Sequence, residues 1–235
     1  MARELKLELH AHTDDDPSDV VPHGARELID RAAALGYDGL AITLHDRWFD
    51  VAPLTAYAQR RGIVLLAGIE RSIQRRHVLL INFSKAATEI RTFGELAALR
   101  AREDGLVIAP HPFYPLRSCL RELMDTHAEL WDAVEVNALY TRQLDFNRRA
   151  IDWAGRHGTP LVGNSDVHVL LQMGTTYSLV EAAPEPTAIC QAIRAGRVEV
   201  RTEPLEWSAA AVIFARMTLA GLQGFQQTGR STRTS

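Results

Sequence analysis

The sequence predicts an α/β protein in which seven short apolar strands alternate with helical segments around a largely parallel sheet. The chain has 235 residues, of which 46% are hydrophobic and 23% are charged, as in a globular protein with a sizeable core. Short apolar runs alternate along it with segments of helical periodicity. Several of these runs are nearly continuous, which is typical of strands covered on both faces.

The seven predicted strands begin near the amino terminus and continue past the middle of the chain. They are Leu5–His12, Gly39–Thr43, Ile63–Glu70, His77–Phe83, Leu106–Pro110, Ala133–Leu139 and Pro160–Asp166. Seven such strand–helix units could close into a barrel or form a doubly wound open sheet. Periodicity alone does not decide between these two architectures.

Helical patterns lie between most of these strands. They cover Ala25–Leu35, Pro53–Arg61, Phe93–Glu103 and Leu144–His157. Three of these segments are followed directly by Gly36, Gly62 and Gly158, and glycine is a common helix stop. Only Arg71–Arg76 separate the third and fourth predicted strands, which leaves little room for a helix there.

The last third of the chain adds four further elements, which we interpret as closure and padding of the barrel. They are a strand at Thr176–Val180, a helix near Thr187–Ala195, a strand at Arg197–Thr202 and a C-terminal helix. No linker-like or repeated segment interrupts the chain. We therefore predict a single domain over residues 1–222 and a flexible, polar tail over residues 223–235.

Charge and cysteine content restrict the partners and the compartment. The net charge of −3 disfavours a long nucleic acid as a partner, because broad basic surfaces bind such polymers. Cys119 and Cys190 are too few for a disulfide scaffold. Met1–Glu4 run directly into the first strand, and the apolar stretch Ala209–Leu222 contains Arg216. We expect a cytoplasmic protein without a membrane partner, and the oligomeric state is left open.

His10 and His12 provide the first chemical signal, at the end of the first predicted strand. Side chains two residues apart in a strand point to the same side. Two imidazoles that converge at a strand end suit a single metal ion. Taken alone, this pair could equally be two polar residues near a loop.

Most other potential metal ligands also fall just beyond the ends of predicted strands. In an α/β barrel, the carboxyl ends of the strands form the active-site face. Histidines scattered over a surface would not follow strand ends, so the pattern favours a metal site. The residues concerned are His45 and Asp46 after the second strand, Glu70 at the end of the third, His77 at the start of the fourth, His111 after the fifth, and Asp166 and His168 after the seventh.

Five motifs in this order resemble those of the PHP (polymerase and histidinol phosphatase) superfamily. They are His10-Ala11-His12-Thr13, Ala41-Ile42-Thr43-Leu44-His45-Asp46, Gly68-Ile69-Glu70, His111-Pro112 and Ser165-Asp166-Val167-His168. The resemblance implies a distorted seven-stranded (β/α)7 barrel with two to three divalent metal ions at its carboxyl-end face. It also implies hydrolysis of phosphoesters.

The resemblance further implies which residues hold each metal. The first metal would be held by His10, His12, Glu70 and Asp166. Glu70 would bridge to a second metal, completed by His77 and His111. A third metal would be held by His45, His168 and one ligand from the loop after His12. The residues expected to take part in catalysis through these metals are His10, His12, Glu70, Asp166 and His168.

The loop ligand of the third metal departs from the family pattern, in which Ser-Asp-Gly commonly follows the His-x-His pair. This chain has Asp14-Asp15-Asp16-Pro17-Ser18-Asp19 and then His23. Asp19 matches the Ser-Asp step a few residues late, so we favour it as the ligand. Asp16 and His23 remain alternatives.

Mixed imidazole and carboxylate ligands favour Zn²⁺, Mn²⁺ or Fe²⁺. Two metals that share a carboxylate lower the pKa of bound water and can supply hydroxide for attack on phosphorus. Arg47, Arg117 and Arg142 follow predicted strand ends and are candidates to bind phosphate, because a guanidinium pairs with two oxygens. Glu135 and Asn137 end the sixth strand and are candidates to orient the ligands.

We therefore predict a metal-dependent phosphoesterase that acts on a small phosphomonoester or a nucleotide. One alternative is an amidohydrolase-type barrel that cleaves C–N bonds. That family commonly uses a carboxylated lysine at the end of a middle strand, and neither Lys6 nor Lys85, the two lysines of this chain, has that position. A second alternative is a degenerate barrel that binds metal without catalysis.

Overall fold

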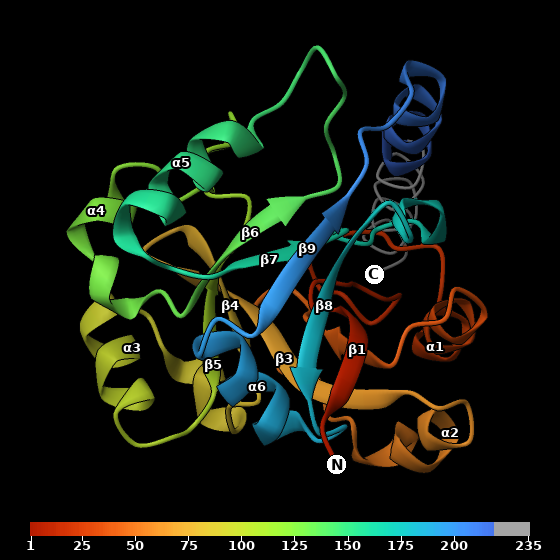
Figure 1. The fold of residues 1–235 in the computed structure, drawn as a ribbon, viewed down its shortest axis with the longest axis horizontal. Coiled ribbons are helices and arrows are strands. Elements are labelled where there is room, and N and C mark those ends of the chain that lie inside the picture. Colours follow the sequence, from red (N-terminus) through yellow and green to blue (C-terminus); the bar gives the residue numbers. More distant parts are fainter. Residues whose placement is uncertain (219–235) are drawn as a thin grey trace, which may run out of the picture.

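The computed structural model describes residues 1–218 and contains one curved sheet of nine strands (Figure 1). The order of the strands across the sheet is β7-β6-β5-β4-β3-β2-β1-β8-β9. Their bounds are β1 (Arg3–Glu8), β2 (Gly39–Ile42), β3 (Val64–Ile73), β4 (Arg76–Ile81), β5 (Leu106–Ala109), β6 (Ala133–Asn137), β7 (Leu161–Asn164), β8 (Thr176–Ala182) and β9 (Val198–Thr202).

Helices surround the sheet and also cover one end of it (Figure 1). The α-helices are α1 (Ala25–Ala34), α2 (Thr55–Gln59), α3 (Phe93–Arg100), α4 (Leu123–Thr126), α5 (Asn147–His157) and α6 (Pro186–Arg194). Short 3-10 helices are η1 (Ala52–Leu54), η2 (Lys85–Glu89), η3 (Ala128–Leu130) and η4 (Leu170–Gln172). A further helix covers residues 207–218.

The predicted α/β fold with a barrel-like sheet is confirmed, but the predicted number of seven strands is wrong. The two segments interpreted as closure, β8 and β9, belong to the same sheet. β8 pairs antiparallel with β1 on one side and with β9 on the other. β1, the partner that joins β8 and β9 to the rest of the sheet, lies near the start of the chain, so local periodicity could not place these two strands.

β4 accounts for the other departure from a regular β/α barrel. It pairs antiparallel with both β3 and β5, because a two-residue turn connects β3 to β4 where a parallel arrangement would need a crossover. Gln74 and Arg75 form this turn with φ values of 49° and 67°, as a tight hairpin of two left-handed residues requires. The short connection expected at Arg71–Arg76 is therefore a hairpin.

The edge strand β7 meets β8, the strand next to the other edge, through a side chain. The Ser178 hydroxyl accepts a hydrogen bond from the Gly163 N–H (2.9 Å) and donates one to the Gly163 carbonyl (3.1 Å). A Cβ on Gly163 would lie 2.6 Å from the Tyr177 carbonyl oxygen. The close approach of these backbones, which nearly closes the barrel, therefore requires glycine at this position.

Apolar residues from around the sheet pack together beneath this closure. Leu7 of β1, Leu66 of β3 and Ile108 of β5 belong to one buried cluster with Ile189 and Ile193 of α6. α6 thus covers the interior of the sheet with its apolar face. This arrangement leaves the opposite end, where the parallel strands finish, for polar side chains.

The C-terminal part of the described chain packs against that polar end. Ile213, in the helix of residues 207–218, is 1% exposed and belongs to a buried cluster with Val169 and Leu205. The tail predicted for residues 223–235, and the end of the domain at residue 222, lie outside the described residues. Among the helices within residues 1–218, none combines the length and the apolar character that a membrane span requires.

The closure at Gly163 generates a prediction about stability. We expect Gly163→Ala to lower the free energy of unfolding by about 1–3 kcal/mol, because the added methyl group forces β7 and β8 apart. Gly155→Ala is the matched control, since a Cβ there meets nothing within 4 Å and alanine in a helix stabilises by about 0.5–1 kcal/mol over glycine. Urea unfolding measures the free energy of unfolding of both variants. Equal effects of the two substitutions would contradict the closure.

Candidate metal centre

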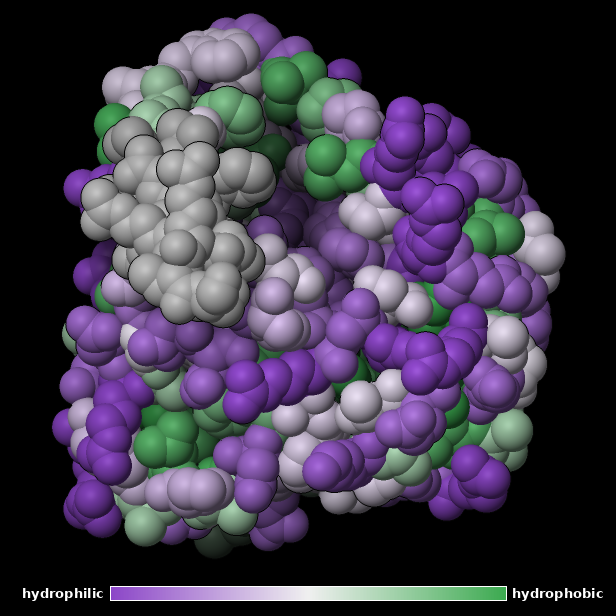
Figure 2. All heavy atoms as spheres, turned by 180° about the vertical axis from the view of Figure 1, so that it is seen from behind, coloured by the Kyte–Doolittle hydropathy of each residue, from purple (hydrophilic) through white to green (hydrophobic). Residues whose placement is uncertain are grey.

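All nine predicted ligands gather at the end of the barrel where the parallel strands finish. Seen from behind, this end of the molecule has a hollow with hydrophilic residues inside it (Figure 2). Each predicted ligand has a nitrogen or oxygen within 4.0 Å of a ligand atom of another member. We call this set the ligand cluster: His10, His12, Asp19, His45, Glu70, His77, His111, Asp166 and His168.

Glu70 is the centre of the ligand cluster. Its Oε2 lies 3.4 Å from Nε2 of both His10 and His12 and 3.0 Å from Nε2 of His45. Its Oε1 lies 2.6 Å from His77 Nδ1 and 3.3 Å from His111 Nε2. The two oxygens of this buried carboxylate thus face two different sets of imidazoles, as a bridging ligand does.

Asp166 also faces His10 and His12, which belong to the first of these two sets of imidazoles. Its Oδ1 lies 3.3 Å from His10 Nε2, 3.5 Å from His12 Nε2 and 3.3 Å from His168 Nδ1. Asp166 and His111 both have positive φ values, 52° and 30°. Such backbone conformations are costly for residues other than glycine and concentrate at functional sites.

Three atoms at the centre of the ligand cluster test whether the site fits a metal. His10 Nε2, His12 Nε2 and Asp166 Oδ1 are buried and have no hydrogen-bond partner among residues 1–218. Buried polar atoms are nearly always paired, and these three converge. Four groups of three cluster residues bring their ligand atoms within 4.8 Å of one another. Nitrogen and oxygen donors so arranged fit a divalent transition metal.

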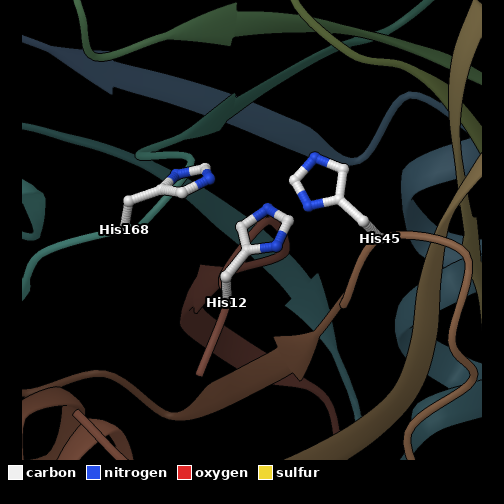
Figure 3. Close-up of side chains that lie close together, drawn as sticks. All are labelled: His12, His45 and His168. Carbon is white, nitrogen blue, oxygen red and sulfur yellow. The ribbon is translucent and has the colours of Figure 1, made fainter. Parts of the chain in front are cut away.

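A further group of imidazoles, which overlaps the first set around Glu70, consists of His12, His45 and His168. Their rings turn toward one another (Figure 3). The ring centroid of His12 lies 4.5 Å from that of His45 and 4.3 Å from that of His168. Asp19 adjoins this group, because its Oδ2 lies 3.0 Å from His168 Nε2 and 3.7 Å from His45 Nδ1. Asp19 as the ligand of a third metal stays a prediction.

The other two loop candidates have different neighbours. The His23 Nε2–H donates to the His12 carbonyl oxygen (3.1 Å), so this imidazole is engaged with the backbone. The Asp16 carboxylate is buried and accepts hydrogen bonds from His12 Nδ1 (2.8 Å) and His45 Nδ1 (3.1 Å). Asp16 therefore contacts the sides of these rings that face away from Glu70.

Glu135 holds two members of the ligand cluster from beneath. Its Oε2 accepts from His10 Nδ1 (2.8 Å) and Asn164 Nδ2 (3.0 Å). Its Oε1 accepts from Asn137 Nδ2 (2.9 Å) and the backbone N–H of His111 (3.2 Å). Because His10 carries its proton on Nδ1, its Nε2 is free to bind a metal. Both predicted orienting residues, Glu135 and Asn137, lie in this network.

Two residues that the sequence analysis did not single out also position the site. Glu8 is buried and accepts from the backbone N–H groups of Ser165 (3.0 Å) and His10 (3.2 Å), and burial raises its pKa to about 8. Gln172 donates to the Asp166 carbonyl (2.8 Å) and accepts from the His168 N–H (2.8 Å). The sequence could have indicated Glu8, since it is an acidic residue in an apolar strand on the same face as His10.

The three predicted phosphate-binding arginines lie apart from the ligand cluster. Arg47, Arg117 and Arg142 are exposed, and Arg47 donates to the Asp15 carbonyl (2.9 Å). Within the described part of the chain, no hydrogen bond or ion pair joins any of them to a cluster residue. Asp46 is paired with Arg71 and also accepts from the Ser72 N–H (2.7 Å), so both of its contacts are structural.

The charges of the ligand cluster compensate one another. Burial alone would lower the pKa of His45, but the Glu70 carboxylate raises it to about 11. Burial also opposes the charge of His168, whose pKa the Asp166 carboxylate raises to about 10. Burial, together with nearby His168, lowers the pKa of His12. A metal ion would take the place of the protons on His45 and His168.

These shifts predict how the stability of the metal-free protein depends on pH. His45 and His168 are protonated up to pH values of about 11 and about 10 in the folded state, but only up to about 6.5 when unfolded. Their stabilisation is complete below about 6.5 and is lost as the pH rises through the folded values.

We therefore expect the free energy of unfolding of the metal-free protein to fall between pH 6.5 and pH 10, as His45 and His168 lose their protons. Urea unfolding in the presence of a chelator measures this slope, and His168→Asn reduces it. A free energy of unfolding that is flat or rises with pH would contradict the charge pattern.

Comparisons with known proteins agree with the fold. A family model described as PHP-associated matches residues 145–198. A two-domain protein from Bacteroides vulgatus, which contains a predicted PHP-like metal-dependent phosphoesterase, aligns with a TM-score of 0.68 and 18% identity over 86% of this chain and 66% of that one. PsfC from Pseudomonas syringae aligns with a TM-score of 0.66 and 15% identity over 93% of this chain and 98% of that one. A search of curated proteins gave no match.

A third structure corrects the expectation about nucleic acid. The lesion-specific endonuclease Q of Pyrococcus furiosus aligns with a TM-score of 0.57 and 17% identity over 84% of this chain and 58% of that one. Endonuclease Q also has a structure in complex with a 27-mer duplex substrate that carries an abasic lesion at the active site. The inference from net charge against long nucleic acid was therefore wrong, because a total charge does not describe the local surface around a site.

Proposed function

We propose that this chain, whose predicted resemblance to the PHP superfamily is confirmed, is a metal-dependent phosphoesterase. The proposal rests above all on the Glu70 carboxylate, whose two oxygens each face a separate set of imidazoles. The three unpartnered atoms on His10, His12 and Asp166 support it. A degenerate barrel is expected to have lost some of these ligands, whereas all nine predicted ligands are present in the ligand cluster.

The ligand cluster divides into three proposed metal sites. A first ion would be held by His10, His12, Glu70 and Asp166. A second would be held by Glu70, His77 and His111, and a third by Asp19, His45 and His168. When bound, such ions lower the pKa of water and neutralise the charge on phosphoryl oxygens. Mn²⁺, Zn²⁺ and Fe²⁺ all suit these donors.

The chain itself supplies orientation and charge. Glu135 keeps the His10 proton on Nδ1, so that Nε2 faces Glu70 and Asp166. Gln172 fixes the backbone on both sides of Val167 through the carbonyl of Asp166 and the N–H of His168. Arg47, Arg117 and Arg142 remain candidates to contact a phosphate that enters from solvent. No side-chain nucleophile is required, since the attacking group is water.

The positions of the lysines favour phosphoester over amide hydrolysis. Lys6 Nζ donates to the Leu35 carbonyl (2.9 Å) and lies 4.4 Å from the centre of the Tyr37 ring. Lys85 is exposed in η2. Neither lysine contacts the ligand cluster, so neither offers the carboxylated bridging ligand of an amidohydrolase-type site. Glu70 has the bridging position instead.

We propose a small phosphomonoester or a nucleotide as the substrate, since the chain, of which residues 1–218 are described, provides a barrel with a polar hollow. Duplex DNA is a necessary second class of substrate in the test, because endonuclease Q has a structure in complex with a duplex substrate. Phosphate release and strand cleavage are separate readouts. Measuring both phosphate release and strand cleavage therefore distinguishes a phosphomonoesterase from a phosphodiesterase.

The test is hydrolysis of a panel of phosphomonoesters, nucleotides and a duplex with an abasic site, with Mn²⁺ or Zn²⁺. We expect turnover that a chelator abolishes and that falls at least about 100-fold in Asp166→Ala and His168→Ala, because each removes a metal ligand. Asp152→Ala is the control for Asp166→Ala, since Asp152 is exposed on α5. Full activity in the chelator would contradict the proposal, as would metal-loaded protein that cleaves no phosphoester.

A further inference from the structure

We propose that Asp16 is a positioning residue shared by two metal sites, and that it is not itself a ligand. This inference rests on the proposed metal centre. One buried carboxylate would then orient a ligand of the first site, His12, and a ligand of the third site, His45. The binding of ions at the two sites would depend on the same side chain.

One oxygen of Asp16 serves the two imidazoles. Oδ2 accepts from His12 Nδ1 at 2.8 Å, from His45 Nδ1 at 3.1 Å and from the backbone N–H of His45 at 2.9 Å. Because the carboxylate only accepts, both rings carry a proton on Nδ1 and present Nε2 on the opposite side. His12 Nε2 is one of the unpartnered buried atoms, and His45 Nε2 lies 3.0 Å from Glu70 Oε2.

The other oxygen of Asp16 shapes the loop that carries Asp19. Oδ1 accepts from the backbone N–H of Ser18 (2.8 Å) and of Asp19 (3.0 Å). Short-range bonds of this kind fix the turn that follows an aspartate. Asp16 therefore also sets the place of Asp19, whose own carboxylate reaches His168.

The number of N–H groups that each carboxylate accepts from explains why we assign Asp16 and Asp19 different roles. A carboxylate offers about four lone-pair positions, and N–H groups from Ser18, Asp19, His12 and His45 already occupy Asp16. The Asp16 side chain is 0% exposed, whereas that of Asp19 is 49% exposed. Within the described part of the chain, the Asp19 carboxylate accepts one hydrogen bond, from His168, which leaves an oxygen that can turn toward an ion. The sequence could not separate these two candidates, and their hydrogen bonds do.

The experiment counts bound metal and measures its affinity in the full chain. Wild type, Asp16→Asn and Asp15→Asn are titrated with Zn²⁺ by calorimetry, and bound metal is counted by elemental analysis at saturation. We expect Asp16→Asn to lower the affinity for at least two ions by about 10–100-fold each, as loss of an orienting partner does. The number of ions bound at saturation should stay unchanged. Asp15→Asn is the matched control, because Asp15 lies in the same loop and, among residues 1–218, its carboxylate reaches only Arg47 (3.8 Å).

Two outcomes would overturn the inference. Loss of one ion at saturation, with the other affinities unchanged, would make Asp16 a direct ligand of one site. Unchanged affinities throughout would mean that Asp16 orients nothing. Since these readouts count metal and not product, an inactive protein that shows the expected affinities overturns the proposed function and leaves this inference standing.

A second measurement needs no variant and therefore does not depend on whether Asp16→Asn folds. Long-range proton–nitrogen correlation spectra of the zinc-loaded wild-type chain report which ring nitrogen carries hydrogen. We expect Nδ1–H in both His12 and His45. An Nε2–H in either ring would contradict the proposed role, because Asp16 would then accept nothing from that ring.

Discussion

The buried Glu70 carboxylate is the interaction on which the rest of the site depends. A carboxylate removed from water is costly unless charge or hydrogen bonds replace its hydration. Here five imidazoles, supplied by segments from β1 to the loop after β5, lie within 3.4 Å of its oxygens. The chain must therefore bring these strand ends to one point. The curvature of the sheet and its closure at Gly163 and Ser178 do so.

A layer of hydrogen-bonded polar groups supports the ligand cluster from beneath. Glu135 connects β6 to His10 and His111, and Glu8 connects β1 to the backbone of Ser165. Networks of this kind stabilise only when every member is satisfied. Asp166 and His111 tolerate positive φ values because bonds on both sides of each residue determine its conformation. Two of the seven non-glycine residues with positive φ within the described chain are thus candidate ligands.

The sequence predicts that the candidate ligands lie close together, because their positions follow from strand geometry. His10 and His12 share a face by alternation, and Ala11 continues that alternation through a bridge to Val167. The membership of β8 and β9 in the main sheet could not be predicted, because it depends on the pairing of β8 with β1, which lies near the start of the chain. The directions of Arg47, Arg117 and Arg142 are likewise not encoded in local pattern, since exposed side chains have few contacts that restrict them.

The number of N–H donors around each carboxylate supports the proposed division of roles within the centre. Glu8, Asp16 and Glu135 accept bonds from backbone, amide or imidazole Nδ1 groups and have little capacity left for an ion. Glu70 and Asp166 face mainly imidazole nitrogens that are themselves potential ligands, and Asp166 Oδ1 has no partner within residues 1–218. Both kinds of carboxylate are buried beside histidine, so residue type and spacing cannot distinguish them. A carboxylate binds metal when its lone pairs are left unsatisfied, and this depends on which N–H groups the surrounding loops bring to it.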